Sequence, residues 1–279
     1  MIGRVFSRNE ELLPIDKGVI PLDDVSFSYG FGVYETLKVR ENVLFFPELH
    51  IERLLNSALL ISLRHDFSAK NAQERLEKLV EANARIPCNI RVLLIRRENG
   101  ADWYAFALSP FFVPRRAYRE GISTLLVEGE RPFPQAKTLG VLVSALAYRQ
   151  AKERGAYDAL LVDRERYVRE GTRTNIFYSD GNTVFTPPAT QVLDGVTRRT
   201  LMELLDKKGL RIVERPLKVE EIPDYAGFFL TSTSSNVLPI SRIGEREVSI
   251  PPIVKVCMEE YREYMKRYAD MKKSAPGGI

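Results

Sequence analysis

Short segments rich in β-branched and aromatic residues alternate with amphipathic helical segments along the whole chain. Gly32 to Arg40 and Val43 to Phe46 are two such segments separated by two residues, a pattern that predicts a β-hairpin. Apolar residues then recur at helical spacing from Pro47 to about Arg64, and a second helix is expected over residues 69–84 with Ser68 as its N-cap. This alternation of the two periods predicts an α+β fold.

Two further strands are expected over Asn89 to Arg97 and Trp103 to Leu108, before the character of the chain changes. Residues 110–119 carry two prolines and two adjacent arginines and show no clear period, as is typical of a linker. A chain of 279 residues is long enough for one large domain or two modest ones. The predicted organisation is a small domain over residues 1–110, an interdomain linker over 111–119 and a larger domain over 120–279.

Helix and strand signals alternate more strictly in the second half of the chain. Gly155 follows a helical stretch and is a typical C-terminal stop, and Asp180-Gly181-Asn182 is a strong turn signal between two short strands. The expected elements are strands over 121–127, 158–162 and 227–230, a hairpin over 176–185 and helices over 139–154, 197–209 and 252–268, followed by a disordered tail.

Charge and composition exclude several classes of protein. The 41 basic and 37 acidic residues leave a net charge of +4, and the basic residues are not gathered in the stripe typical of nucleic-acid-binding proteins. No apolar run approaches the roughly 20 residues that span a bilayer, and the N-terminal residues lack the apolar stretch of a secretory signal. We therefore expect no nucleic-acid partner, no membrane association and a cytoplasmic location.

The cysteines and histidines are too few for a metal centre or a disulfide framework. Cys88 and Cys257 lie far apart in the sequence and are expected to be small core residues. The two histidines, His50 and His65, leave no multi-histidine metal site and disfavour a Ser-His-Asp triad. No metal is expected.

Familiar nucleotide-binding motifs are missing from the sequence. Gly30-Phe31-Gly32 lacks the third glycine of a dinucleotide-binding fingerprint, and no P-loop sequence occurs. Four short segments remain, each of them weak alone: QAKTLG around Lys137, VREGTRTN around Glu170, GVTR from Gly195 and TSTSS from Thr231.

These segments belong to a longer ordered series between about Phe31 and Ile240: GVYETLKV, HIERL, QAKERGAYDALLVD, EGTRTNIF, TVFTPP, DGVTRRTLMELL and FLTSTSSNVLPI. In this order the series resembles the fold-type IV enzymes that depend on pyridoxal 5'-phosphate (PLP), the class IV aminotransferase family. This family includes D-amino-acid and branched-chain aminotransferases and aminodeoxychorismate lyases. The resemblance implies a small N-terminal and a larger C-terminal α/β domain. It also implies a homodimer in which the partner's small domain completes each active site.

The resemblance gives Lys137 the central chemical role, because the matching lysine of the family forms the Schiff base with PLP. Partial withdrawal from water favours the neutral amine that imine exchange requires. Once a substrate has displaced it, the same amine can move the α-proton as a general acid and base. By the same resemblance, Glu170 pairs with the protonated pyridine nitrogen and keeps the ring an electron sink.

The cofactor phosphate needs a set of hydrogen-bond donors, and the resemblance assigns four residues to it. Arg53 offers a charge-assisted guanidinium fork. Val196 and Thr197 lie at a helix start, where backbone N–H groups point outward. Thr233 adds a hydroxyl from the TSTSS turn.

Substrate-binding residues are expected on both domains. Arg173, three residues after Glu170, is placed to bind a substrate carboxylate bidentately. Arg97 is a second arginine for this role, on a strand of the small domain. Tyr34 from the small domain and Ser234 from the TSTSS turn complete the expected substrate set.

The reaction implied is transamination. The GVTR and TSTSSN segments resemble the aminotransferase branch, and TSTSSN is closer to its D-amino-acid members. We therefore expect the amino group of a D-amino acid, such as D-alanine or D-glutamate, to pass to a 2-oxo acid. Gly140 and Asn236 stand where D-amino-acid members usually have Asn and Glu, so a branched-chain L-amino-acid aminotransferase and an aminodeoxychorismate lyase remain alternatives. A non-catalytic nucleic-acid-binding protein is the remote alternative.

Overall fold

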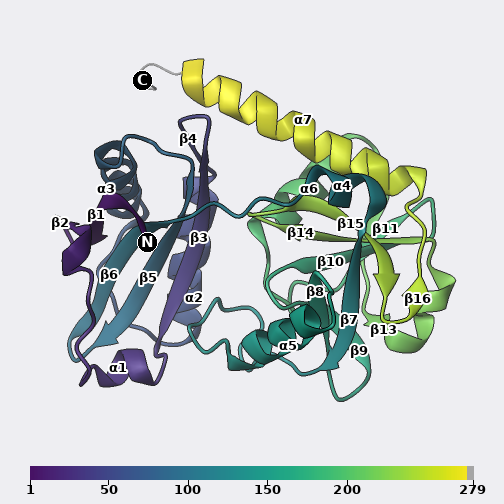
Figure 1. Ribbon diagram of the computed structural model, residues 1–279, viewed down its shortest axis with the longest axis horizontal. Coiled ribbons are helices and arrows are strands. Elements are labelled where there is room, and N and C mark those ends of the chain that lie inside the picture. The colour runs from purple at the N-terminus through teal and green to yellow at the C-terminus, as the bar shows by residue number, and fades with distance from the viewer. Residues whose placement is uncertain (275–279) are drawn as a thin grey trace. The chain divides into compact units, whose positions relative to one another are not determined.

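The computed structural model describes residues 1–274 and divides them into two compact units (Figure 1). The first unit contains Met1–Phe111, Ala136–Gly140 and the described residues from Lys266 onward, and the second contains Phe112–Gln135 and Val141–Met265. The sequence prediction placed the five residues 136–140 and the C-terminal end in the larger domain. In the structure these two pieces pack with the N-terminal unit instead.

The first unit is built on a six-stranded antiparallel sheet in the order β2-β1-β6-β5-β3-β4. Its strands are β1 (Ile2–Arg8), β2 (Glu11–Pro14), β3 (Gly32–Arg40), β4 (Val43–Phe45), β5 (Cys88–Arg97) and β6 (Gly100–Leu108). Its complete helices are η1 (Ile15–Lys17), α1 (Val25–Ser28), α2 (Pro47–Leu60) and α3 (Ala69–Ala82). The predicted hairpin and both predicted helices are confirmed. Ser68 caps α3, since its hydroxyl accepts the backbone N–H of Asn71.

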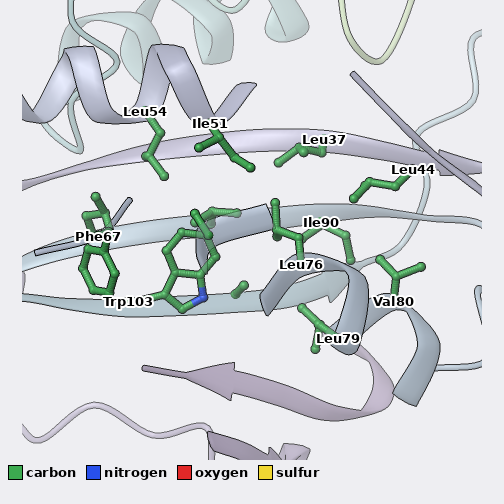
Figure 2. Packing of buried hydrophobic residues seen from close by; sticks show 14 of the residues in the cluster. Leu37, Leu44, Ile51, Leu54, Phe67, Leu76, Leu79, Val80, Ile90 and Trp103 are labelled. Atoms are coloured by element: carbon green, nitrogen blue, oxygen red, sulfur yellow. The ribbon is translucent and has the colours of Figure 1, made fainter. Parts of the chain in front are cut away.

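The core of the first unit is formed by side chains of α2, α3 and the sheet (Figure 2). Leu37 and Ile90 from the sheet meet Ile51 from α2 and Leu76 from α3, and Trp103 is fully enclosed among such residues. Alternate residues of β5 and β6 and most alternate residues of β3 face this core, which is the period that the sequence shows. Burying each of these apolar side chains contributes about 1.5–3 kcal/mol, so the sheet and the two helices hold each other in place.

The second unit contains a ten-stranded mixed sheet in the order β12-β11-β10-β14-β15-β7-β8-β9-β13, with β16 paired to β15. The pairs β11–β12, β15–β7 and β7–β8 are parallel and the others are antiparallel. The strands are β7 (Ile122–Glu128), β8 (Asp158–Val162), β9 (Tyr167–Gly171), β10 (Asn175–Ser179), β11 (Val184–Thr186), β12 (Ile212–Glu214), β13 (Leu217–Lys218), β14 (Gly227–Ser232), β15 (Asn236–Ile243) and β16 (Arg246–Glu247).

The helices of the second half are α4 (Arg115–Glu120), α5 (Leu142–Glu153), α6 (Val196–Lys207), the 3₁₀ helix η2 (Val219–Asp224) and α7 (Pro252–Ser274). Helix α4 lies largely inside the predicted linker. Helix α5 begins three residues later than predicted, because the residues before it are used in a pairing with β3. Helix α7 continues beyond its predicted end at Tyr268, and from Lys266 onward its residues belong to the first unit.

Several smaller predictions can be compared directly with the structure. Cys88 and Cys257 are unbridged and buried, as expected of small core residues. Among the described residues, no helix combines the length and apolar character that a bilayer crossing requires. Residues 275–279, most of the tail predicted to be disordered, lie outside the described residues.

Candidate active site

The main chain around Lys137 is held as an extra short strand beside β3. The backbone N–H of Tyr34 donates to the Lys137 carbonyl at 2.9 Å, and the N–H of Leu139 donates to the Gly32 carbonyl at 2.9 Å. Gly32 allows this close packing, since a Cβ there would lie 2.3 Å from the Leu94 carbonyl oxygen and 2.8 Å from the Leu139 side chain. The predicted reactive lysine therefore has a fixed backbone although it lies outside any named strand or helix.

The Lys137 side chain lies against Tyr34, the residue predicted to line the substrate pocket. Its Nζ is 4.7 Å from the centroid of the Tyr34 ring, and the Arg91 guanidinium carbon is 4.6 Å from the same centroid. Such cation–π contacts hold a cation near an aromatic face at modest energetic gain. Tyr34 thus links the lysine to an arginine of β5.

Arg53, predicted to bind the cofactor phosphate, projects from α2 onto the carboxylate of Glu35 on β3. Its Nε donates to Glu35 Oε1 at 2.6 Å and its Nη2 donates to Oε2 at 3.0 Å, a bidentate fork. His50 Nδ1 lies 2.8 Å from Glu35 Oε2. Glu35 and His50 are both about 1% exposed, so this cluster is an enclosed part of the first unit.

Opposing effects act on the charges of this cluster. Burial alone would raise the pKa of Glu35, but Arg53 and His50 outweigh it and hold that pKa well below its usual range. Burial lowers the pKa of His50, although Glu35 acts in the opposite direction. Glu35 is therefore ionised and His50 neutral near pH 7. Neutral His50 donates to the carboxylate only as the tautomer with its proton on Nδ1.

Glu170, predicted to pair with the pyridine nitrogen, lies near the end of β9 in the second unit and is 5% exposed. Its Oε1 accepts a hydrogen bond from Arg131 Nη1 at 3.0 Å, and its Oε2 accepts one from the Leu193 backbone N–H at 3.3 Å. These two partners fix the orientation of the carboxylate.

Val196 and Thr197, two predicted phosphate ligands, form the first turn of α6, with Gly195 as the N-cap residue. A Cβ on Gly195 would lie 2.1 Å from Asn175 Oδ1, so only glycine allows the chain to pass this side chain. The Thr197 hydroxyl lies 3.5 Å from the hydroxyl of buried Tyr261 on α7. The first N–H groups of this 12-residue helix have no carbonyl partner within the helix, which makes a helix start suitable for a phosphate.

Thr233 and Ser234, predicted for phosphate and substrate, lie in the turn between β14 and β15 and are half-buried. The turn is closed by its own hydroxyls: Ser232 Oγ accepts the Ser235 backbone N–H at 3.1 Å and lies 2.7 Å from Ser235 Oγ. At the end of β14, the buried hydroxyl of Thr231 has no hydrogen-bond partner among the described residues. The segment therefore offers a cluster of polar groups at the turn that joins two central strands of the sheet.

Comparison with known proteins shows the family to which the chain belongs. The family model described as amino-transferase class IV matches residues 32–243. The D-alanine aminotransferase of Bacillus licheniformis is 27% identical over 86% of each chain, and a probable branched-chain-amino-acid aminotransferase of Rickettsia bellii is 30% identical over 92% of this chain and 95% of its own. A branched-chain aminotransferase of Thermoproteus uzoniensis, crystallised with norvaline, superposes with a TM-score of 0.86 at 26% identity over 94% of both chains.

The chain belongs to the class IV aminotransferase family. It is therefore a PLP-dependent transaminase with the two-part α+β fold of fold type IV, and the predicted fold class is confirmed. The two units, each taken by itself, contain groups of the kinds that can bind this cofactor: a guanidinium and a lysine in the first, and a helix start and a carboxylate held by two hydrogen bonds in the second.

The two arginines predicted for the substrate of this aminotransferase differ in their surroundings. Arg97 donates to Asp102 at 2.8 Å and to Tyr104 at 3.1 Å, and it also forms an ion pair with Asp24 at 2.7 Å. Arg173 is exposed, and its guanidinium stacks 4.2 Å from the Tyr148 ring centroid while Nη2 donates to a tyrosine hydroxyl at 2.8 Å. Arg97 is thus surrounded by two carboxylates, whereas aromatic contacts orient Arg173.

Sequence reasoning missed four side chains around the predicted site residues. Glu35 binds Arg53 and is contacted by His50, Arg91 lies over Tyr34, and the hydroxyl of Ser57 accepts the Lys137 backbone N–H. Arg91 lies in the predicted strand, but the substrate role was predicted for Arg97 at the end of that strand. In the antiparallel pair of β3 and β5, Arg91 is opposite Thr36, so it shares the face of Tyr34 two residues away. The Nε of Arg91 is buried without a hydrogen-bond partner among the described residues. Strand alternation combined with the register could have found it.

Proposed function

We propose that Lys137 is the covalent attachment point of PLP and the base that moves the substrate α-proton. The observation that supports this most directly is the way the lysine is held, with its backbone paired to β3 and its Nζ 4.7 Å from the Tyr34 ring centroid. An amine on a fixed backbone can return to the same position after each proton transfer. Bound PLP supplies the electron sink that makes the α-proton removable.

In this proposal, the remaining cofactor contacts come from residues of both units. Arg53, the backbone N–H groups of Val196 and Thr197, and the hydroxyls of Thr197 and Thr233 would bind the phosphate. Glu170, oriented by Arg131 and the Leu193 backbone, would hold a proton on the pyridine nitrogen.

The substrates in this proposal are a D-amino acid, such as D-alanine or D-glutamate, and a 2-oxo acid. Arg173 would bind the α-carboxylate of the donor, with Tyr34 and Ser234 lining the pocket. Its orientation by an aromatic ring and hydroxyl supports this assignment, because a bidentate carboxylate contact requires a guanidinium in a defined plane. Arg97 is the second arginine in the proposal, and its carboxylate partners make it less available for a substrate.

Branched-chain L-amino acids are the second candidate substrates. The names of the Rickettsia bellii relative and of the Thermoproteus uzoniensis structure favour this class, whereas the Bacillus licheniformis relative favours D-alanine.

We also propose that the protein acts as a cytoplasmic homodimer. Exposed hydrophobic side chains gather in one segment of the first unit, namely Val19, Leu22, Val25, Phe27 and Tyr29. Contiguous exposed apolar side chains of this kind mark interaction sites in soluble proteins. Light scattering after size-exclusion chromatography should give twice the chain mass of 31.9 kDa, and a monomer at the assay concentration would reject this assignment.

The visible spectrum of the purified holoenzyme tests the substrate class. The protein is mixed separately with D-alanine, D-glutamate, L-leucine and aminodeoxychorismate, and the cofactor band is followed. Loss of the band with the D-amino acids alone supports the proposal, and loss with L-leucine alone makes it a branched-chain enzyme. Pyruvate release from aminodeoxychorismate with no response to amino acids would make it a lyase.

Two substitutions test the residue roles. Lys137→Ala should abolish covalent cofactor attachment, whereas Lys218→Ala, whose ammonium also lies near a tyrosine ring at 5.3 Å, should behave as wild type. Arg173→Ala should raise the KM for the donor about tenfold or more with the cofactor still bound, as loss of a charge-assisted contact requires. An unchanged KM would reject this role for Arg173.

A further inference from the structure

Ser57 lies one helical turn after Arg53 on α2 and is about 1% exposed. Its hydroxyl donates to the Arg53 carbonyl at 2.7 Å and accepts the backbone N–H of Lys137 at 3.1 Å. A single buried hydroxyl therefore connects the helix that carries the phosphate arginine to the backbone of the reactive lysine.

Glu35 makes a second connection between the same two residues. It is adjacent to Tyr34 on β3, whose backbone N–H donates to the Lys137 carbonyl, and its carboxylate binds the side chain of Arg53. The carboxylate is itself fixed, since Oε2 also accepts the Thr36 backbone N–H at 3.0 Å and contacts His50 Nδ1 at 2.8 Å. Strand β3 thus contacts both the Arg53 side chain and the Lys137 backbone. Helix α2, which carries Arg53, contacts the Lys137 backbone through Ser57.

We propose that Glu35 and Ser57 are positioning residues that hold Arg53 and Lys137 in one rigid frame. This inference rests on the proposed roles of Arg53 and Lys137. A cofactor bound through its phosphate at one end and through a lysine at the other requires the two anchors at a constant separation. Small errors in such a separation are costly, because functional groups act only within about 0.5 Å of their productive geometry.

Electrostatic attraction alone predicts that Glu35 weakens phosphate binding by Arg53, the opposite of what a positioning role predicts. A carboxylate next to the phosphate arginine neutralises it and therefore weakens its attraction for a phosphate. If attraction dominated, Glu35→Gln would bind PLP more tightly than wild type. If orientation dominates, as we infer from the bidentate fork, the same substitution weakens binding, because glutamine has only one acceptor oxygen and its NH2 group cannot accept the second guanidinium N–H.

The test compares Glu35→Gln and Ser57→Ala with wild type in a PLP titration of cofactor-stripped protein, followed by equilibrium dialysis. Glu35→Gln should raise the Kd for PLP about 10- to 100-fold, by analogy with residues that orient the ligands of a metal. Ser57→Ala should raise it about 2- to 10-fold, the loss of one hydrogen bond. Both should lower the fraction of chains that carry cofactor after borohydride reduction, measured by mass spectrometry.

Asn83→Ala is the matched control, because Asn83 is a buried side chain of the same unit with four hydrogen bonds to the backbone of Arg4, Val5 and Leu79. It should lower the stability of the first unit and leave the PLP Kd unchanged. A Kd for Glu35→Gln that equals or falls below that of wild type overturns the inference, and so does an equal rise in Asn83→Ala.

Lys137→Ala separates this inference from the function on which it rests. If that variant still carries cofactor on the same chain after borohydride reduction, the proposed function fails. If it loses the attachment while Glu35→Gln and Ser57→Ala bind PLP as wild type does, the positioning network alone is rejected.

Discussion

Among the described residues, the most deeply buried carboxylate is Glu35 in the first unit and Asp158 in the second, and the two respond to burial differently. Burial raises the pKa of both groups. At Glu35 the Arg53 guanidinium and His50 reverse this effect, so that the pKa is well below its usual range. At Asp158 the Thr172 hydroxyl, the charge of Arg173 and the Thr174 hydroxyl offset burial only in part, and the pKa stays above its usual range.

The two carboxylates consequently perform different tasks. Glu35 is a permanent charge that orients another charge. Asp158 organises a turn: it accepts the Thr172 hydroxyl at 2.5 Å, the Thr174 hydroxyl at 3.0 Å and the Ala159 N–H at 2.9 Å. That turn carries Arg173 between β9 and β10, next to Glu170. Both carboxylates lie near an arginine, but only Glu35 is hydrogen-bonded by a guanidinium among the described contacts. This direct contact, rather than depth of burial, separates the ionised carboxylate from the one that serves mainly as a hydrogen-bond acceptor for the turn.

Glu35→Ala gives the largest expected effect. It leaves the nearly buried Arg53 guanidinium without its carboxylate, which should cost about 3–5 kcal/mol of unfolding free energy. Urea unfolding followed by the fluorescence of Trp103, the single tryptophan and a core residue of this unit, measures it. Glu81→Ala, which removes an exposed partner of Arg85, should cost less than about 1 kcal/mol. Equal losses in the two variants would contradict this account of Glu35.

The pH dependence of the first unit is the next largest effect. His50 and Glu35 both have lowered pKa values, so they bind fewer protons in the folded than in the unfolded state. The stabilisation that these two groups contribute is therefore complete above pH 6.5 and is lost as the pH falls, first below the usual histidine value of 6.5 and then below the usual glutamate value of 4.5. Trp103 fluorescence should show this loss, and Glu35→Gln should reduce its lower part.

Asp158 should contribute with the opposite sign. Its raised pKa means that the folded state binds the proton more tightly, so its contribution is greatest at low pH and declines as the pH rises through the folded pKa. Asp158→Asn keeps the acceptor for one threonine hydroxyl and should cost only about 1 kcal/mol at pH 7. Circular dichroism of the second unit's unfolding measures the change. A loss as large as that of Glu35→Ala would show that the charge of Asp158 is required.

The reactivity of the two cysteines is the smallest expected effect. It is also a simple control, because each unit contains one of these buried thiols. Each unit buries one thiol, and burial raises the pKa of Cys88 to about 11 and that of Cys257 to about 12. Both should react with a thiol reagent at pH 8 far more slowly in the folded protein than in urea, because the thiolate is the nucleophile. Rapid reaction of either thiol in the folded state would mean that its unit opens locally.

Much of the secondary structure of the first unit can be predicted from the local sequence. The hairpin of β3 and β4, the helices α2 and α3 and the Ser68 cap depend on neighbouring residues, and their signals are correspondingly clear. The ends of helices are harder to predict where neighbouring residues pair with a segment that is distant in the sequence. Helix α5 begins at Leu142 and not at residue 139, because Lys137 and Leu139 pair with β3, more than 100 residues earlier in the chain.

The motif series by itself determined the family, the reaction class and the cofactor, because the order of short motifs is a property of the chain and needs no coordinates. The tertiary structure alone decided which groups surround the predicted reactive residues. Glu35 and Ser57 contact Arg53 and Lys137 only because β3, α2 and residues 136–140 fold together, and Arg91 reaches Tyr34 only through the register of β3 and β5. Such contacts depend on packing between segments far apart in the sequence, where no local pattern records a partner.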